Sequence, residues 1–190
     1  MPTDWLVRPA QTTDKEGVER CLSASYSELL QNDYPPEVLE RTLPLMTTAR
    51  SELLECPTWY VVVHPDTNEI VGCGGWTRHA PNEPNNNDQL CPHLRHFATD
   101  PRYARQGIGR ALWQRCWEGI CEMGAQTRIE AFSTLTAVPF YESLGFRKVK
   151  KMEVCLGCGS DPVDFPSVLM ERRPGWKISQ FVMLMTGDHP

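Results

Sequence analysis

The stretch from Leu94 to Trp113, LRHFATDPRYARQGIGRALW, decides the fold of this chain. We predict a strand over His93–Thr99 that ends at Asp100–Pro101, followed by a turn that contains glycines and then a helix. The helix is predicted from Gly109 to Met123, because four apolar side chains lie on one stripe: Ile108, Leu112, Cys116 and Ile120. A helix N-terminus exposes unpaired amides and carries a partial positive charge, and glycines let a ligand approach the backbone. The segment is therefore typical of a phosphate-binding loop, with an ordinary tight turn as the alternative.

The charges around this turn favour a specific anion over nucleic acid. The chain has 24 acidic against 19 basic residues and a net charge of −5, so it lacks the dense basic surface that nucleic-acid binding requires. Five arginines nevertheless cluster here: Arg95, Arg102, Arg105, Arg110 and Arg115. A dinucleotide fingerprint is excluded because Leu112 occupies its third small position, and the Gly-Lys-Ser/Thr triplet of a P-loop is absent.

Length and composition indicate one globular domain. The chain has 190 residues, 41% of them hydrophobic, which is enough for one core. The first ten residues hold no apolar run typical of a signal peptide, and no stretch approaches the ~20 apolar residues of a membrane span. We therefore expect a cytoplasmic protein without a membrane partner, with reduced thiols and no metal, although Cys155 and Cys158 have the spacing of half a zinc site.

The N-terminal half predicts helices followed by a hairpin. A capping box at Thr13–Glu16 precedes an apolar helical face made by Val18, Leu22, Tyr26 and Leu30. A second helix is expected from Glu37 until Pro44 stops it, and a short third one over Thr48–Glu55. Strands are expected at Trp59–Val63 and Glu69–Trp76, the latter with a bulge or a close backbone approach because it contains Gly72, Gly74 and Gly75.

The C-terminal half continues the alternation of strands and helices. The remaining predicted elements are strands at Thr127–Phe132, Phe146–Cys155 and Pro166–Glu171 and a helix at Ala137–Leu144, which together indicate a mixed α/β sheet. Residues 1–173 are expected to form one domain. The tail, 174–190, carries an apolar patch at Phe181–Met185 that packs on the domain or forms a homodimer contact.

Two segments resemble the GNAT acetyltransferases. Asp100–Leu112 is similar to motif A of that family, Arg/Gln-x-x-Gly-x-Gly/Ala, although Ala104 stands at the leading Arg/Gln position. Ser133–Phe146 is similar to motif B, Ala-x-x-Phe-Tyr-x-x-x-Gly-Phe. The resemblance extends over Val7–Arg172. It implies a single α+β domain, with a mixed, largely antiparallel sheet flanked by helices and a splayed pair of central strands.

The resemblance also implies acetyl-CoA as the cosubstrate. Backbone groups of Phe97 and Thr99 would contact the pantetheine arm, and the amides from Arg105 to Arg110 would bind the diphosphate. The full set of implied cofactor residues is Phe97, Ala98, Thr99, Arg105, Gln106, Gly107, Ile108, Gly109, Arg110, Ala137 and Phe140.

The expected activity is direct transfer of an acetyl group to a primary amine of a small molecule or peptide in a ternary complex. By resemblance, Tyr141 is the acid that protonates the departing thiolate, with simple packing beside Phe140 as the alternative. His96 and Glu130 are the candidate bases, and each has a purely structural role as its alternative. A GNAT-fold protein that binds an acyl-CoA without turnover is the second hypothesis for the whole chain.

The acceptor site is expected between the N-terminal helices, Val18–Leu54, and the loop Pro81–Cys91. Acidic residues in these segments would attract a cationic amine, or would form a solvated helix face: Glu28, Asp33, Glu37 and Asp88.

Overall fold

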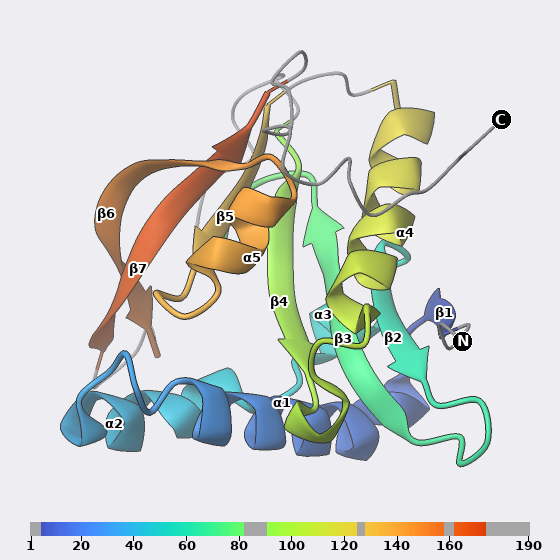
Figure 1. Ribbon diagram of the computed structural model, residues 1–190, viewed down its shortest axis with the longest axis horizontal. Coiled ribbons are helices and arrows are strands. Elements are labelled where there is room, and N and C mark those ends of the chain that lie inside the picture. The colour runs from blue at the N-terminus through green and yellow to red at the C-terminus, as the bar shows by residue number, and fades with distance from the viewer. Residues whose placement is uncertain (1–4, 82–90, 125–127, 158–161, 174–190) are drawn as a thin grey trace, which may run out of the picture.

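A computed structural model describes residues 5–81, 91–124, 128–157 and 162–173 of the chain (Figure 1). Within these ranges the strands form one sheet in the order β1-β2-β3-β4-β5-β7-β6. The strands are β1 Leu6–Pro9, β2 Trp59–Val63, β3 Ile70–Thr77, β4 His93–Thr99, β5 Ile129–Ser133, β6 Arg147–Leu156 and β7 Val163–Arg172. Neighbouring strands are antiparallel except β4 and β5, which are parallel. The expected mixed, largely antiparallel sheet is confirmed.

Helices cover both faces of this sheet and enclose a core on each. They are α1 Lys15–Leu29, α2 Pro36–Met46, α3 Ser51–Leu54, α4 Ile108–Glu122 and α5 Val138–Ser143. The predicted stripe of α4, including Leu112 and Ile120, packs with Trp76 and Met170 in one core. The predicted face of α1 packs with α2, α3 and the other side of β2 in the second core. The two faces of the sheet therefore belong to different groups of helices, as Figure 1 shows.

The sheet divides between β4 and β5. Only two residue pairs join these strands, His93 with Glu130 and Leu94 with Ala131. Beyond Leu94 the strands separate, and in Figure 1 they lie close at one end and apart at the other. The expected splayed central strands are thus present, and the remainder of β4 faces an opening instead of a partner strand.

A bulge in β4 lies at the point where the strands part. His96 and Phe97 together oppose Gly74, because Cys73 pairs with Ala98 while Gly75 already pairs with Arg95. His96 takes a left-handed conformation with φ 49°, and Gly74 has φ 153°. A Cβ on Gly74 would lie 2.7 Å from the Phe97 ring, so the close approach predicted for this glycine-rich strand is confirmed.

A tyrosine between α1 and α2 links the two halves of the sheet. The Tyr34 hydroxyl donates to the carbonyl of Pro166 on β7 (2.9 Å) and accepts from the amide of Leu135 (2.7 Å). The neighbouring Asp33 carboxylate accepts a hydrogen bond of 2.6 Å from Thr136. These contacts tie the loop after β5 to the N-terminal helices across the opening.

Two local predictions in the N-terminal half were wrong. The capping box forms at Gln11 and Asp14 instead of Thr13 and Glu16, because the Asp14 carboxylate accepts from the Gln11 amide (2.8 Å) and is held by the Arg8 guanidinium (2.7 and 2.8 Å). Pro44 lies inside α2, which continues to Met46. A proline in the last turn removes only one hydrogen bond of the helix, and the burial of Met46 offsets this loss.

Candidate active site

The turn before α4 has the backbone conformation of an anion-binding helix start. Gly107 caps α4 with φ 90° and Arg105 has φ 63°, both in the left-handed region. The Trp5 indole N–H donates to the Gln106 carbonyl (2.8 Å), which fixes the turn from outside. A Cβ on Gly109 would lie 3.0 Å from the Phe140 ring, so this glycine allows α5 to pack on the first turn of α4.

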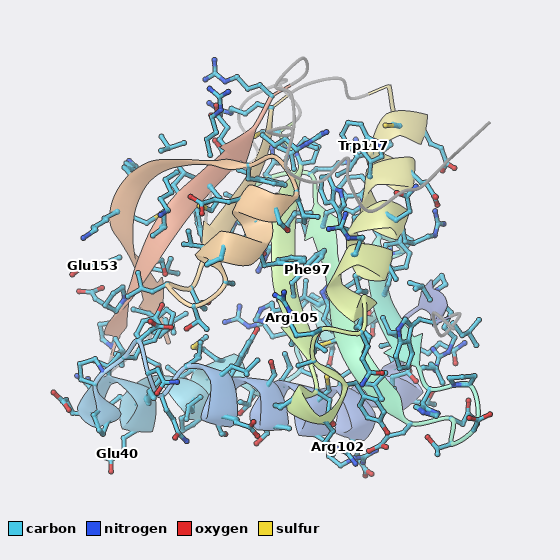
Figure 2. The ribbon with its side chains drawn as sticks, viewed as in Figure 1. Glu40, Phe97, Arg102, Arg105, Trp117 and Glu153 are labelled. Atoms are coloured by element: carbon cyan, nitrogen blue, oxygen red, sulfur yellow. The ribbon has the colours of Figure 1, made fainter. Side chains whose placement is uncertain are left out.

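A first cavity of about 560 Å³ opens onto this turn. Ten of the eleven residues implied as cofactor contacts line it: Phe97, Ala98, Thr99, Arg105, Gly107, Ile108, Gly109, Arg110, Ala137 and Phe140. The eleventh, Gln106, does not line it and instead accepts the hydrogen bond from Trp5. Phe97 and Arg105 lie in the opening beside β4, as Figure 2 shows.

The charges of the first cavity suit a large anion. Its lining brings Arg105 and Arg110 to the N-terminus of the 15-residue helix α4, and no carboxylate is among the described residues that line it. Helix amides and guanidinium groups are the usual ligands of a diphosphate. Ala104 also lines the cavity, but its methyl group leaves any side-chain contact to the two arginines.

A second cavity of about 450 Å³ meets the first where the strands part. The two cavities share four lining residues: Tyr26, Phe97, Thr134 and Ala137. The second cavity continues between α2, the start of β4 and the ends of β6 and β7. Two ligands, one bound in each cavity, would therefore come into contact beside Phe97.

Tyr141 lines the second cavity within a group of aromatic rings. Its ring centroid lies 5.4 Å from that of Phe140 and 6.4 Å from that of Phe97. Burial raises the pKa of the Tyr141 phenol well above its usual value of about 10, so the hydroxyl is protonated at neutral pH. Tyr141 therefore lies in the wall of the second cavity with its phenol protonated, and it also packs in the core, as the structural alternative predicts.

His96 lines the second cavity from the bulge of β4. Burial, followed by the charges of Arg95 and Arg50, lowers the pKa of its imidazole to about 4. The ring is therefore neutral at pH 7 and is a weak base.

Glu130 is not brought to either cavity. It lies on β5 opposite His93, and its carboxylate forms an ion pair of 3.0 Å with Arg128. Of the three candidate catalytic residues, the structure brings together Tyr141 and His96 in the wall of the second cavity and leaves Glu130 outside it, where β4 and β5 are still paired.

Tyr26, Arg50, His93 and Arg95 are among the residues that line the second cavity and that the sequence did not assign to a site. Tyr26 was assigned only to the apolar face of α1, yet it lines both cavities. Arg95 was counted among the arginines of the phosphate loop but lines the second cavity with Arg50 and His93. The alternation of β4 contained the signal, because His93 and Arg95 lie on one side of the strand and Leu94 on the other.

The acidic residues expected to attract a cationic amine do not line the second cavity. Glu28 and Glu37 are exposed on α1 and α2, and Asp33 bonds to Thr136. Asp88 and the loop 82–90 lie outside the described residues, as do Cys158 and the tail 174–190. The second cavity is lined instead by arginines, and this reverses the expected sign of its charge.

Two further searches concern the described residues alone. None of their His, Cys, Asp and Glu side chains form a group of three or more that could hold a metal ion. No helix in this part of the chain combines the length and apolarity that crossing a bilayer requires.

Comparison with known proteins identifies a family model that matches more than half of the chain. Residues 30–158 match the model described as an acetyltransferase (GNAT) domain. A search of the curated proteins gives no match.

Solved structures of low sequence identity share the fold. A GCN5-related N-acetyltransferase from Rhodopseudomonas palustris is 14% identical with a TM-score of 0.70, covering 91% of this chain and 98% of that one. The PaiA N-acetyltransferase of Thermoplasma acidophilum, in complex with coenzyme A, is 15% identical with a TM-score of 0.64 (90% and 99%). A mosquito arylalkylamine N-acetyltransferase-like protein is 15% identical with a TM-score of 0.59 (89% and 99%).

Proposed function

Since the chain belongs to the GNAT acetyltransferase family, we propose that it moves an acetyl group from acetyl-CoA to a primary amine of a small molecule or peptide. The observation that carries this proposal is the meeting of two cavities beside Phe97, one at the start of α4 and the other beneath Tyr141. Such an arrangement lets donor and acceptor reach each other within one ternary complex, so that binding supplies the orientation for direct attack.

The first cavity would hold the CoA. The amides at Gly107–Arg110 and the guanidinium groups of Arg105 and Arg110 would bind its diphosphate. The backbone of β4 beyond Leu94 has no strand partner on the β5 side and would contact the pantetheine arm. The PaiA structure, which shares the fold, contains coenzyme A, and this supports a cosubstrate of that class.

Residues of the second cavity would manage the charges and protons of the transfer. As the amine nitrogen bonds to the acetyl carbon, an oxyanion develops, and a backbone amide of β4 beyond Leu94 would donate to it. When the carbon–sulfur bond breaks, Tyr141 would give its proton to the thiolate. His96 would pass the amine's proton to water, because a base with a pKa of about 4 does not hold it.

The alternative is a protein that binds acyl-CoA without turnover. The buried phenol of Tyr141 in the wall of the second cavity favours an enzyme, because cofactor binding in the first cavity does not require a proton donor there.

A screen of amines with acetyl-CoA separates the two. We expect acetyl-CoA to raise the melting temperature through binding, and at least one amine to release free CoA thiol and give the acetylated product by mass spectrometry. Thermal stabilisation without any acetylated product would support the binding protein. No stabilisation at millimolar acetyl-CoA would contradict both.

A further inference from the structure

The charges of the second cavity indicate what kind of amine it accepts. We propose that the acceptor is a small apolar amino acid, whose carboxylate is bound by Arg95 and Arg50 while its amine faces the first cavity. The proposal rests on the proposed function, because it names the acceptor of that reaction.

Arg95 is a half-buried cation without a carboxylate partner among the described residues. Its side chain projects from β4, and within the described residues it donates one long hydrogen bond, of 3.5 Å, to the Thr77 hydroxyl. The loss of water around a guanidinium is costly unless an anion compensates it, and arginine forms two parallel hydrogen bonds with a carboxylate. A ligand carboxylate would supply this compensation.

Arg50 adds a second positive charge to the same wall. It caps the short helix α3, is exposed, and forms no ion pair with the part of the chain that the structure describes. Both arginines line the second cavity, and the charge of Arg50 contributes, after burial, to lowering the pKa of Arg95. Like charges held together without an internal counterion favour an external one.

The other described residues of the wall leave this charge uncompensated. No Asp or Glu lines the second cavity within the described ranges. His93 and His96 are neutral at pH 7, because burial and the charge of Arg95 lower their pKa values to about 3 and about 4. A polyamine, which carries only positive charge, would be repelled by this wall.

Beside the arginines, the histidines and a few hydroxyl side chains such as Ser133 and Ser167, the wall carries apolar side chains that would surround the rest of the acceptor. Apolar side chains come from α2, β5, β6 and β7: Leu45, Met46, Phe132, Val154, Leu156 and Phe165. A volume of about 450 Å³ is in the range of small-molecule sites. The arginines call for an anionic group, the apolar side chains for an apolar body, and the reaction for an amine. A small molecule that combines these three groups is an apolar amino acid.

Matched amine pairs test the class of substrate. Phenylalanine and 2-phenylethylamine differ by one carboxylate, as do leucine and 3-methylbutylamine, and spermidine serves as the cationic probe. We expect kcat/KM for the carboxylated member of each pair to be at least ~10-fold higher, the size typical of a buried charge pair. Equal values within the pairs, or a preference for spermidine, would overturn the proposal. A preference for the phosphonate analogue of phenylalanine over phenylalanine would overturn the assignment to a carboxylate.

Arginine variants test the assigned residues. Arg50→Gln should raise KM for phenylalanine by about threefold or more and leave 2-phenylethylamine unchanged, and Arg95→Gln should have the larger effect because Arg95 is more buried. Arg50→Glu should shift the preference toward the amine without a carboxylate. Arg20→Gln, on the exposed side of α1, is the matched control and should change nothing. Arg50 is exposed, so its variants decide the question if Arg95→Gln fails to fold.

The outcomes separate this proposal from the proposed function. Acetylation that is indifferent to the carboxylate and to both arginines would overturn the proposal and leave the acetyltransferase in place. Thermal stabilisation by acetyl-CoA without acetylation of any amine would overturn the proposed function and this proposal together. An increase in KM for acetyl-CoA alone in both arginine variants would assign these residues to the cosubstrate and overturn the proposal.

Discussion

His93 and His96 should make the protein less stable as the pH falls from 7.5 to 5.5. The pKa of His93 is lowered to about 3 and that of His96 to about 4, in both cases mainly by burial and then by the charge of Arg95. Both rings are neutral in the folded protein over this range. In the unfolded chain their pKa values return to about 6.5, so the unfolded state takes up the protons first.

The size of the effect follows from these values. At pH 7.5, about one unit above the unfolded pKa, both states are largely unprotonated and the two histidines hardly change stability. Below the unfolded pKa each histidine lowers the free energy of unfolding by up to ~1.4 kcal/mol for each pH unit, until the pH reaches its folded pKa. At pH 5.5 the two together should account for a loss of about 2–3 kcal/mol, a large share of the stability of a typical domain.

Urea unfolding at pH 7.5, 6.5 and 5.5 measures this loss. His93→Gln and His96→Gln should each remove about half of the pH dependence, and the double variant nearly all of it. His79→Gln, outside both cavities, is the control and should leave the dependence intact. In an NMR titration, Arg95→Gln should raise the pKa values of His93 and His96, because it removes a positive charge beside them. A double variant that loses as much stability as the wild type between pH 7.5 and 5.5 would refute the assignment.

Three further changes probe the rest of the molecule. Gly109→Ala should force the Phe140 ring toward the first cavity, because the new Cβ would lie 3.0 Å from that ring. We expect the free energy of unfolding to fall by about 1–3 kcal/mol and CoA to bind more weakly. Calorimetry that finds wild-type affinity for CoA would contradict this. Tyr141→Phe should lower kcat about 10²-fold with CoA affinity retained, whereas Tyr103→Phe, outside both cavities, should not; equal turnover of the two would rule out the acid role. Asp14→Asn should lower the free energy of unfolding by about 2 kcal/mol near pH 7. The hydrogen bond with Arg8 lowers the pKa of Asp14, so its charged form stabilises the fold and the difference from wild type should shrink below about pH 4. A difference in urea unfolding that stays constant with pH would contradict this.

The sequence correctly predicted the elements whose signals lie within a short stretch of chain. The hairpin of β2 and β3 and the strand–turn–helix around Gly107 carry their signals within a few residues, in β-branched runs, turn residues and a helical stripe. The bulge was expected from glycines alone, but its partner, His96 with φ 49°, was not, because a positive φ is uncommon at any non-glycine residue, histidine included.

Predictions from the sequence were wrong or incomplete where a contact between distant parts of the chain determines the local structure or the composition of a cavity. Asp14 forms the capping box because Arg8 on β1 holds it, and no local pattern contains that pair. Ten implied cofactor residues line one cavity because they come from adjoining stretches of chain, whereas the second cavity combines Arg50, Arg95 and the far ends of β6 and β7. Its charge could be read only after folding had brought those segments together.

The parting of β4 and β5 also separates the residues proposed to hold the donor from those proposed to select the acceptor, so protein engineering can treat the two sets separately. Most of the contacts expected for the donor come from one continuous run, Phe97–Arg110, which extends into the first turn of α4. The opposite wall is assembled mainly from α2, the residue before α3 and two strand ends, all of which lie outside that run in the sequence. Exposed positions of this wall, such as Leu45 and Arg50, could therefore be diversified in a library to recruit new amines, while the run proposed to hold the donor is left untouched.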